Sequence, residues 1–388
     1  MDFDYTWLLA LPLFFILGWI AARVDVSRLL NETSTLPASY FRGLNFLISE
    51  QPDKAIEAFT EALKIDSDTL ELHFALGNLF RRTGEMDRAI RLHQGLLDRE
   101  TLDETTRLMA LAELSQDYLK AGLLDRAEEL FAKLTETARY AQSALRALLE
   151  IYVHEKEWVQ AIETAQKLEA LSGNPLGLEI AQFHCELAHQ QMLLGDPEQA
   201  GKNLHAALEA NRNCVRANVM LGDLAANQQH HQEALQLWRA VELQMPEYIE
   251  LIAARMMISW RALGKATEGL DWLQDAVRKY ALEETAQVLF EATLDLRGPE
   301  AAYRMAHDEA DISPTLAALD RLLQAKVSGM PDGDLRLVID AIKQHLEHTA
   351  YHRCTTCGFT ARQFHWHCPS CAEWETFPPS KYEKAVTA

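Results

Sequence analysis

The clearest pattern along this chain is a phrase of apolar and polar positions that returns about every 34 residues. The stretch GLNFLISEQPDKAIEAFTEAL, beginning at Gly43, returns as GNLFRRTGEMDRAIRLHQGLL, beginning at Gly77. Apolar residues recur with helical spacing inside each phrase, and a turn such as Thr83-Gly84-Glu85 divides it. A repeated phrase of this length predicts pairs of amphipathic helices, each joined by a short turn.

A small residue lies midway through each phrase, and its recurrence counts the repeats. The positions are separated by 34, 38, 34, 39, 34 and 35 residues; they are Ala55, Ala89, Ala127, Ala161, Ala200, Ala234 and Gly269. Small residues are expected where two helix backbones approach closely, and stacked pairs bury their apolar faces jointly. The unit resembles the tetratricopeptide repeat (TPR) family. That resemblance implies an all-α, right-handed superhelix, or α-solenoid, with a concave binding face.

The repeat pattern sets the expected limits of the helical region. About seven TPR repeats are predicted over residues 36–282, with glycines in the inter-helix turns at Gly122, Gly195 and Gly264. At such turns a backbone with positive φ costs glycine little. Over residues 283–347 the helical pattern degenerates, with breaks at 298–299, 313–314 and 330–333. This stretch is expected to form two further, irregular helix pairs.

The N-terminus carries a different pattern, an uninterrupted apolar run. Residues 5–22, YTWLLALPLFFILGWIAA, contain no charged side chain and as a helix would span roughly 27 Å, close to the thickness of a bilayer core. A cleaved signal peptide is the alternative, but Asp2 and Asp4 stand where a basic region is needed. We predict a transmembrane anchor over 1–23 and a linker over 24–35. Arg23 and Arg28 follow the span, which favours a cytoplasmic location for the rest of the chain.

The charge of the chain limits its partners. The formal net charge is −20, which would repel a polyanion, so nucleic acid is not expected to bind. Arg81, Arg82, Arg88 and Arg91 form a local basic group. These four arginines are interpreted as exposed helix charges, with an acidic partner surface as the alternative.

Four of the six cysteines lie in one short segment near the C-terminus. Two Cys-x-x-Cys pairs stand ten residues apart in CTTCGFTARQFHWHCPSC, and they are Cys354, Cys357, Cys368 and Cys371. Two such pairs predict a tetrathiolate site for one metal ion, either iron or zinc. Four protein ligands leave no open position for an activated water, so a metallohydrolase is disfavoured. His352, His365 and His367 are expected to be neighbours of the site, not ligands.

The segment around these cysteines, residues 350–378, resembles rubredoxin, and a tail follows over 379–388. The first knuckle reads CTTCG, whereas Ala372 follows the second, CPSC, where rubredoxins have glycine. That difference and the short gap weaken an electron-transfer role. A module this small and rich in aromatic residues needs its metal, and docking on the helices, to fold.

No catalytic site is predicted, because the chain contains no phosphate-binding glycine loop, HExxH motif or spaced triad. A TPR array is typically a binding platform. Cys185 and Cys214 fall on helical positions rich in Ala and Leu, and we interpret them as small core residues. A redox role for this pair is the alternative.

The anchor, the first two repeats and the CxxCGFTA…WHCPSC module together resemble the lipopolysaccharide assembly protein B family of Gram-negative bacteria. The resemblance implies a single-pass inner-membrane adaptor whose bulk is cytoplasmic. It further implies an adaptor that lowers lipopolysaccharide synthesis by presenting the lipid A committed-step deacetylase, UDP-3-O-acyl-N-acetylglucosamine deacetylase, to a membrane AAA+ zinc protease. Other lipopolysaccharide assembly proteins, and a second copy of the chain, are possible partners. A general envelope-assembly scaffold and a rubredoxin-like electron carrier are the alternatives.

Overall fold

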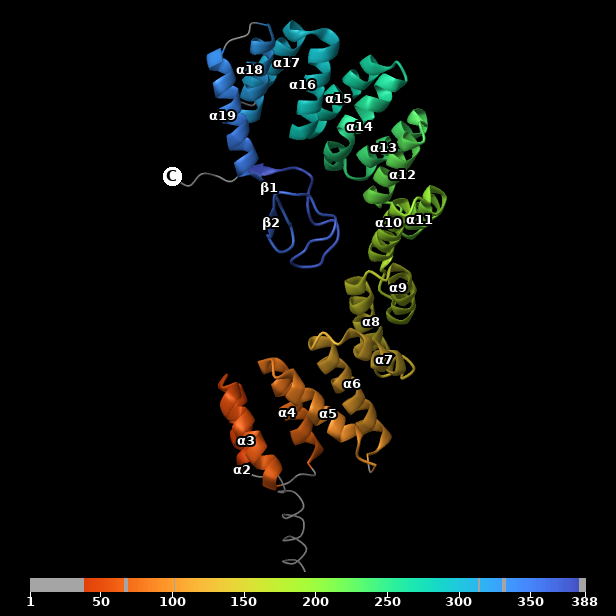
Figure 1. The fold of residues 1–388 in the computed structure, drawn as a ribbon, viewed down its shortest axis with the longest axis vertical. Coiled ribbons are helices and arrows are strands. Elements are labelled where there is room, and N and C mark those ends of the chain that lie inside the picture. The colour runs from red at the N-terminus through yellow and green to blue at the C-terminus, as the bar shows by residue number, and fades with distance from the viewer. Residues whose placement is uncertain (1–37, 66–68, 101, 313–314, 330–332, 384–388) are drawn as a thin grey trace, which may run out of the picture. The chain divides into compact units, whose positions relative to one another are not determined.

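The computed structural model describes residues 38–65, 69–100, 102–312, 315–329 and 333–383. The predicted membrane anchor and linker lie outside these residues. Within them, no helix is both long enough and apolar enough to cross a bilayer. The described chain is an α-helical solenoid that ends in a small module with β-strands (Figure 1).

The chain divides into two compact units, residues 1–151 and 152–388. The described helices of the first unit alternate with short turns: α2 (Ala38–Ile48), α3 (Pro52–Ile65), α4 (Leu70–Thr83), α5 (Met86–Leu97), α6 (Glu104–Lys120) and α7 (Leu124–Leu134). Helix α8 (Ala141–Glu155) contains the boundary.

The second unit continues the same alternation. Its helices are α9 (Trp158–Ser172), α10 (Gly177–Leu193), α11 (Pro197–Ala210), α12 (Val215–Asn227), α13 (His231–Gln244), α14 (Ile249–Ala262), α15 (Ala266–Tyr280), α16 (Glu283–Arg297), α17 (Pro299–Ile312), α18 (Leu316–Gly329) and α19 (Gly333–Thr349). A 3₁₀ turn, η1 (Pro246–Tyr248), precedes α14. The stretch expected to hold two irregular pairs thus contains α16 to α19.

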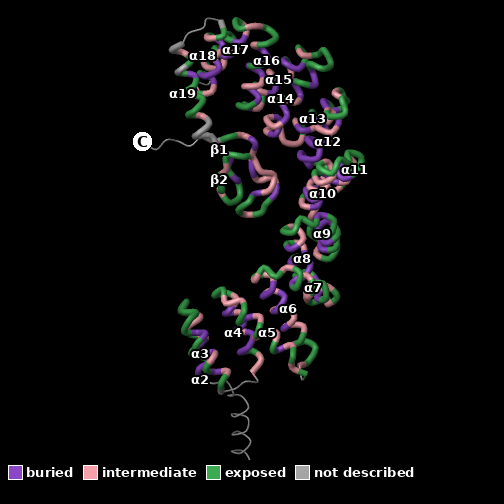
Figure 2. Tube along the Cα trace, viewed as in Figure 1, coloured by how far each residue is buried: buried purple, intermediate pink, exposed green. Residues whose placement is uncertain are grey.

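The small residues that count the repeats are all buried on the second helix of a pair. The six alanines, from Ala55 to Ala234, have no exposed surface, and Gly269 is buried as well. A glycine on the first helix often faces a ring sixteen residues later. A Cβ at Gly43 would lie 2.5 Å from Phe59, and one at Gly222 would lie 2.3 Å from Trp238. Buried positions therefore follow the faces between paired helices (Figure 2).

The turns between paired helices have the backbone that the sequence predicts. Gly122, Gly195 and Gly264 have φ values of 73°, 79° and 70°. Three repeats place Glu50, Lys156 and Gln229 in the same left-handed region, at φ 55°, 60° and 65°. The turn conformation is thus kept even where a side chain makes it more costly.

The arginines of the first unit make contacts within the chain. Arg81 donates to Asp117 at 2.7 Å and to Glu113 at 2.6 Å. Arg88 pairs with Glu85 at 2.6 Å and lies over the Phe80 ring at 4.0 Å. These contacts favour the interpretation of Arg81 and Arg88 as helix charges over a free basic surface.

The C-terminal module contains a three-stranded sheet, so the all-α description holds only for the solenoid. Strand β1 (Ala350–Arg353) follows α19 directly and lies between β2 (Thr360–Ala361) and β3 (Tyr382–Glu383). Both pairings are antiparallel, with His352 opposite Ala361 and Tyr351 opposite Tyr382. The helices from α12 to α19 curve around the module (Figure 1).

Candidate metal centre

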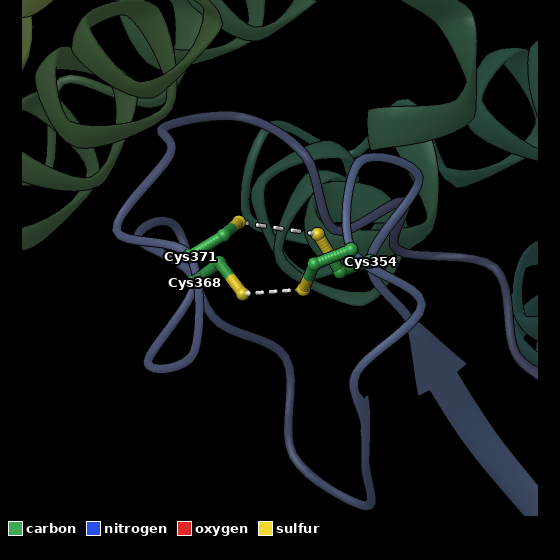
Figure 3. Close-up of side chains that lie close together, drawn as sticks. Cys354, Cys368 and Cys371 are labelled. Atoms are coloured by element: carbon green, nitrogen blue, oxygen red, sulfur yellow. Dashed lines mark hydrogen bonds between the residues drawn. The ribbon is translucent and has the colours of Figure 1, made fainter. Parts of the chain in front are cut away.

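The fold brings the four cysteines of the two Cys-x-x-Cys pairs together. Their sulfur atoms all lie within 4.8 Å of one another. The Sγ atoms of Cys354 and Cys371 are 3.8 Å apart, and those of Cys357 and Cys368 are 3.7 Å apart (Figure 3). A tetrahedron of sulfurs about 2.3 Å from a central ion has edges of about 3.8 Å. The sulfurs therefore have the spacing of a tetrathiolate metal site, which zinc and iron both fit.

The two knuckles share one backbone design. The Gly358 N–H donates to the Cys354 carbonyl at 3.0 Å, and the Ala372 N–H donates to the Cys368 carbonyl at 2.9 Å. Gly358 has φ 76° and Ala372 has φ 59°. Ala372 thus adopts the left-handed conformation that glycine supplies in the first knuckle. Alanine in place of glycine therefore does not distort the turn of the second knuckle.

The thiols are unequal before a metal binds. Burial raises the pKa of Cys354, but the Cys357 N–H and the Thr376 hydroxyl outweigh it, and the pKa falls to about 6. The Glu373 N–H favours the thiolate of Cys371, but burial and the three neighbouring sulfurs raise its pKa to about 12. Four sulfurs this close together do not readily all become thiolates, because the negative charges repel one another. A bound cation offsets that repulsion, which is the chemistry that this set of ligands suits.

The three histidines of the module make other contacts. His352 Nδ1 is 3.1 Å from the Pro378 carbonyl, and His367 Nε2 is 2.9 Å from the Ala372 carbonyl. The His365 ring lies edge-on to Phe377. Among the described residues, the group close enough to hold an ion consists of the four cysteines.

One face of the module docks on the helical array through aromatic rings. Trp366 stacks on Tyr248 of η1, with ring centroids 5.3 Å apart and planes 16° apart. Phe364 meets the same tyrosine edge-on at 6.1 Å. Tyr248 is 1% exposed, and burial raises the pKa of its hydroxyl. Within the module, Phe359 packs against Phe377.

A buried arginine of α12 lies between two tryptophans of the module. The Arg216 guanidinium is 5.8 Å from the Trp366 ring centroid and 5.9 Å from that of Trp374. Its charge is paired with Glu186 of α10 at 2.9 Å. Trp374 also meets Phe183 of α10 edge-on. An arginine placed this way attracts both ring faces and keeps a carboxylate partner.

Polar contacts complete the docking surface. Gln182 of α10 donates to Glu375 of the module at 2.7 Å, and Lys381 pairs with Glu284 of α16 at 2.7 Å. Burial raises the pKa of Glu375, although Arg216 and Gln182 oppose the shift. The module is therefore held on α10, α12, η1 and α16 by directional contacts as well as apolar ones.

Comparison with known proteins agrees with both parts of the fold. Residues 352–379 match the rubredoxin metal binding domain family, and residues 36–69, 72–108, 113–175 and 185–245 match tetratricopeptide repeat families. The chain is 34% identical over 376 residues to lipopolysaccharide assembly protein B of Escherichia coli (strain K12), covering 96% of this chain and 97% of that protein. The chain belongs to the lipopolysaccharide assembly protein B family. Its Haemophilus influenzae relative is 31% identical over 387 residues, with the same coverage.

Solved TPR structures resemble this family member only loosely. The crystal structure of yeast Tom70 is 12% identical and covers 80% of this chain and 91% of that one, with a TM-score of 0.33. Naa15/Naa10 bound to HypK-THB is 14% identical, covers 80% of this chain and 46% of that one, and has a TM-score of 0.45. Likeness at this level carries no argument about function.

Sequence reasoning identified the sulfurs but missed the residues of the array that receive the module. Gln182 and Glu375 are 193 positions apart, and nothing near Arg216 or Tyr248 in the sequence indicates an aromatic partner. One signal was available. The module has more tryptophan and phenylalanine side chains than a domain of its size can bury by itself. Such surplus aromatic surface on a small module indicates a docking face.

Proposed function

We propose that this protein is an inner-membrane adaptor that regulates lipopolysaccharide synthesis. In this proposal an N-terminal segment, residues 1–23, anchors the chain, and the bulk of it lies in the cytoplasm. The adaptor presents the lipid A committed-step deacetylase to the membrane AAA+ protease, which degrades it. Cys354, Cys357, Cys368 and Cys371 hold one structural metal ion, and the chain itself catalyses no step.

One observation carries the proposal: the metal module is seated on the array of a chain that aligns with lipopolysaccharide assembly protein B over 96% of its length. A closed tetrathiolate ion has no position for a substrate, so its role is to hold the module in shape. The helix pairs of the second unit, with the module folded onto them, present a surface built from several repeats. Such a surface suits protein partners.

Confinement to a membrane supplies the mechanism. An anchored adaptor and an anchored protease share one plane, so a deacetylase held by the adaptor meets the protease at a raised effective concentration. No chemical step by this chain is needed. A deletion of residues 1–22 should therefore leave a folded protein that no longer supports deacetylase turnover. An unchanged deacetylase half-life in cells carrying only the truncated form would contradict the mechanism.

The decisive experiment is affinity purification from solubilised membranes, with wild type beside Cys354→Ser. The wild type should recover the protease and the deacetylase as its main partners. The substituted protein should keep its helical content but lose the metal, the deacetylase and the short deacetylase half-life. Recovery of many unrelated envelope proteins would favour a general assembly scaffold instead. Full activity of a metal-free variant would refute the role given to the ion.

The identity of the metal separates the adaptor from an electron carrier. A carrier requires iron, with a visible thiolate-to-iron band that bleaches reversibly on reduction. We expect a zinc-loaded protein to bind the same partners as the native form. Partner binding lost on zinc loading and restored by iron would support the electron carrier.

A further inference from the structure

Two cysteines outside the metal site face each other inside the array. Cys185 lies on α10 and Cys214 is the N-cap residue of α12, and their sulfurs are 3.8 Å apart. Neither residue has exposed surface. They belong to one core cluster with alanines such as Ala181 and Ala217. A disulfide requires sulfurs about 2.05 Å apart, so these two need to approach by roughly 1.8 Å, which side-chain rotation and small helix shifts can supply.

The two thiols are chemically different, as an attacking and a resolving thiol are. The contact with Cys185 and the Ala217 N–H at the start of α12 lower the pKa of Cys214, and Arg216 adds to the effect. The contact with Cys214 and burial raise the pKa of Cys185. A helix N-terminus and a nearby cation are the surroundings in which cysteine thiolates form most readily. Cys214 is therefore the nucleophile of the pair.

The pair is connected to the docked metal module through one side chain. Gln182 Nε2 lies 3.7 Å from the Cys214 sulfur and donates to Glu375 of the module at 2.7 Å. The Glu375 charge disfavours both thiolates, whereas Arg216 favours them. When the module leaves, the carboxylate leaves with it and the arginine stays on α12. Departure of the module thus removes a charge that suppresses the reactivity of the pair.

We propose that Cys185 and Cys214 are an oxidative modification site, forming a reversible disulfide when the metal module undocks from the array. The co-reactant is a low-molecular-weight disulfide such as oxidised glutathione. The Cys214 thiolate attacks one of its sulfurs and releases one glutathione thiolate, which takes up a proton. Cys185, losing its proton to solvent, then attacks the mixed disulfide at Cys214 and releases the second glutathione. Two protein thiols are oxidised, and one glutathione disulfide is reduced to two thiols.

Linkage makes the effect reciprocal. If undocking raises the equilibrium constant for forming the disulfide, the disulfide must weaken docking by the same factor. The contact between Gln182 and the Cys214 sulfur is the local reason, because bonding to Cys185 draws that sulfur away. A disulfide formed in the core of the repeat thereby weakens the contacts at the docking surface. This inference does not depend on the adaptor role.

The test follows the disulfide in full-length, zinc-loaded protein treated with oxidised glutathione. After alkylation of free thiols and digestion with trypsin, a Cys185–Cys214 bond joins the peptides 168–202 and 213–216. Trp366→Ala and Trp374→Ala each weaken docking from the module side without touching either thiol. We expect both variants to form the linked peptide at least ten-fold faster than wild type. Phe359→Ala, which removes a ring contact within the module, should match wild type.

Three further results decide the inference. Cys185→Ala should stop at a mixed disulfide of Cys214 with glutathione. The oxidised wild type should show faster amide exchange in the module, and reduction by dithiothreitol should reverse it. Equal rates of linkage in wild type and in both tryptophan variants, with circular dichroism showing intact helices, would overturn the connection to docking. Oxidation of the four metal-site cysteines with no linked peptide would overturn the site itself.

Discussion

Replacement of Trp366 by alanine tests how the module is held. In the docked state Trp366 stacks on Tyr248 at 5.3 Å and lies 5.8 Å from the Arg216 guanidinium. An aromatic pair contributes about 0.5–1.5 kcal/mol beyond its buried area, and a cation–π contact about 0.5–1 kcal/mol. Their loss should cost about 2 kcal/mol of docking free energy, or roughly a thirty-fold lower docking constant.

Hydrogen exchange detects the weaker docking as faster opening of the docked surface. Amides of η1 and of β1 should exchange faster in Trp366→Ala, while those of α4 and α5 in the first unit keep their rates. Phe359→Ala is the matched control, because Phe359 packs on Phe377 inside the module and makes no ring contact with the array among those the structure describes. Metal content should be determined for both variants. Unchanged exchange at η1 in a metal-loaded Trp366→Ala protein would refute the docking described above.

Further predictions concern the metal turn, the helix crossings and pH. Ala372→Gly should stabilise the metal-loaded module by about 1 kcal/mol, seen as slower zinc loss to a chelator, because glycine adopts positive φ without strain; faster loss would contradict this. Gly222→Ala should destabilise the second unit by about 1–3 kcal/mol in urea unfolding, since its Cβ would lie 2.3 Å from the Trp238 Nε1 atom; an unchanged midpoint would count against the crossing. Burial raises the pKa of Glu250 from 4.5 to about 7, so the folded state retains a proton that the unfolded state releases. Its contribution to stability is present below pH 4.5 and is lost as pH rises through about 7, and Glu250→Gln should flatten the fall over that range.

The repeat architecture could be predicted because close helix packing requires a small residue at fixed intervals along the sequence. Ala55 and Ala234 lie 179 positions apart in the sequence, yet each occupies the same fully buried crossing of a helix pair. A local requirement met in every repeat becomes a periodic signal. The four metal-site cysteines could also be predicted from the sequence, because a tetrahedral ion needs four sulfurs and two short turns supply them.

The docking surface could not be located, because it depends on contacts between distant parts of the chain. Arg216 and Trp374 each look ordinary within their own segments, and only the three-dimensional path of the chain brings them together. The backbone conformation of Ala372 could not be inferred from its residue type either. The residue type indicates a departure from rubredoxin, whereas the backbone keeps φ at 59° with the hydrogen bond of the first knuckle.

The pairing of β1 with β3 has a consequence for how firmly the module must be held. Because β1 and β3 lie side by side and β1 continues directly from α19, the first and last described strands of the module meet at the end of α19. The module is therefore joined to the array at the end of α19. An undocked module stays close to its docking surface, at an effective concentration in the millimolar range. Contacts too weak to hold two separate proteins together are therefore enough to keep the module docked. Weakening a few of them is enough to undock it.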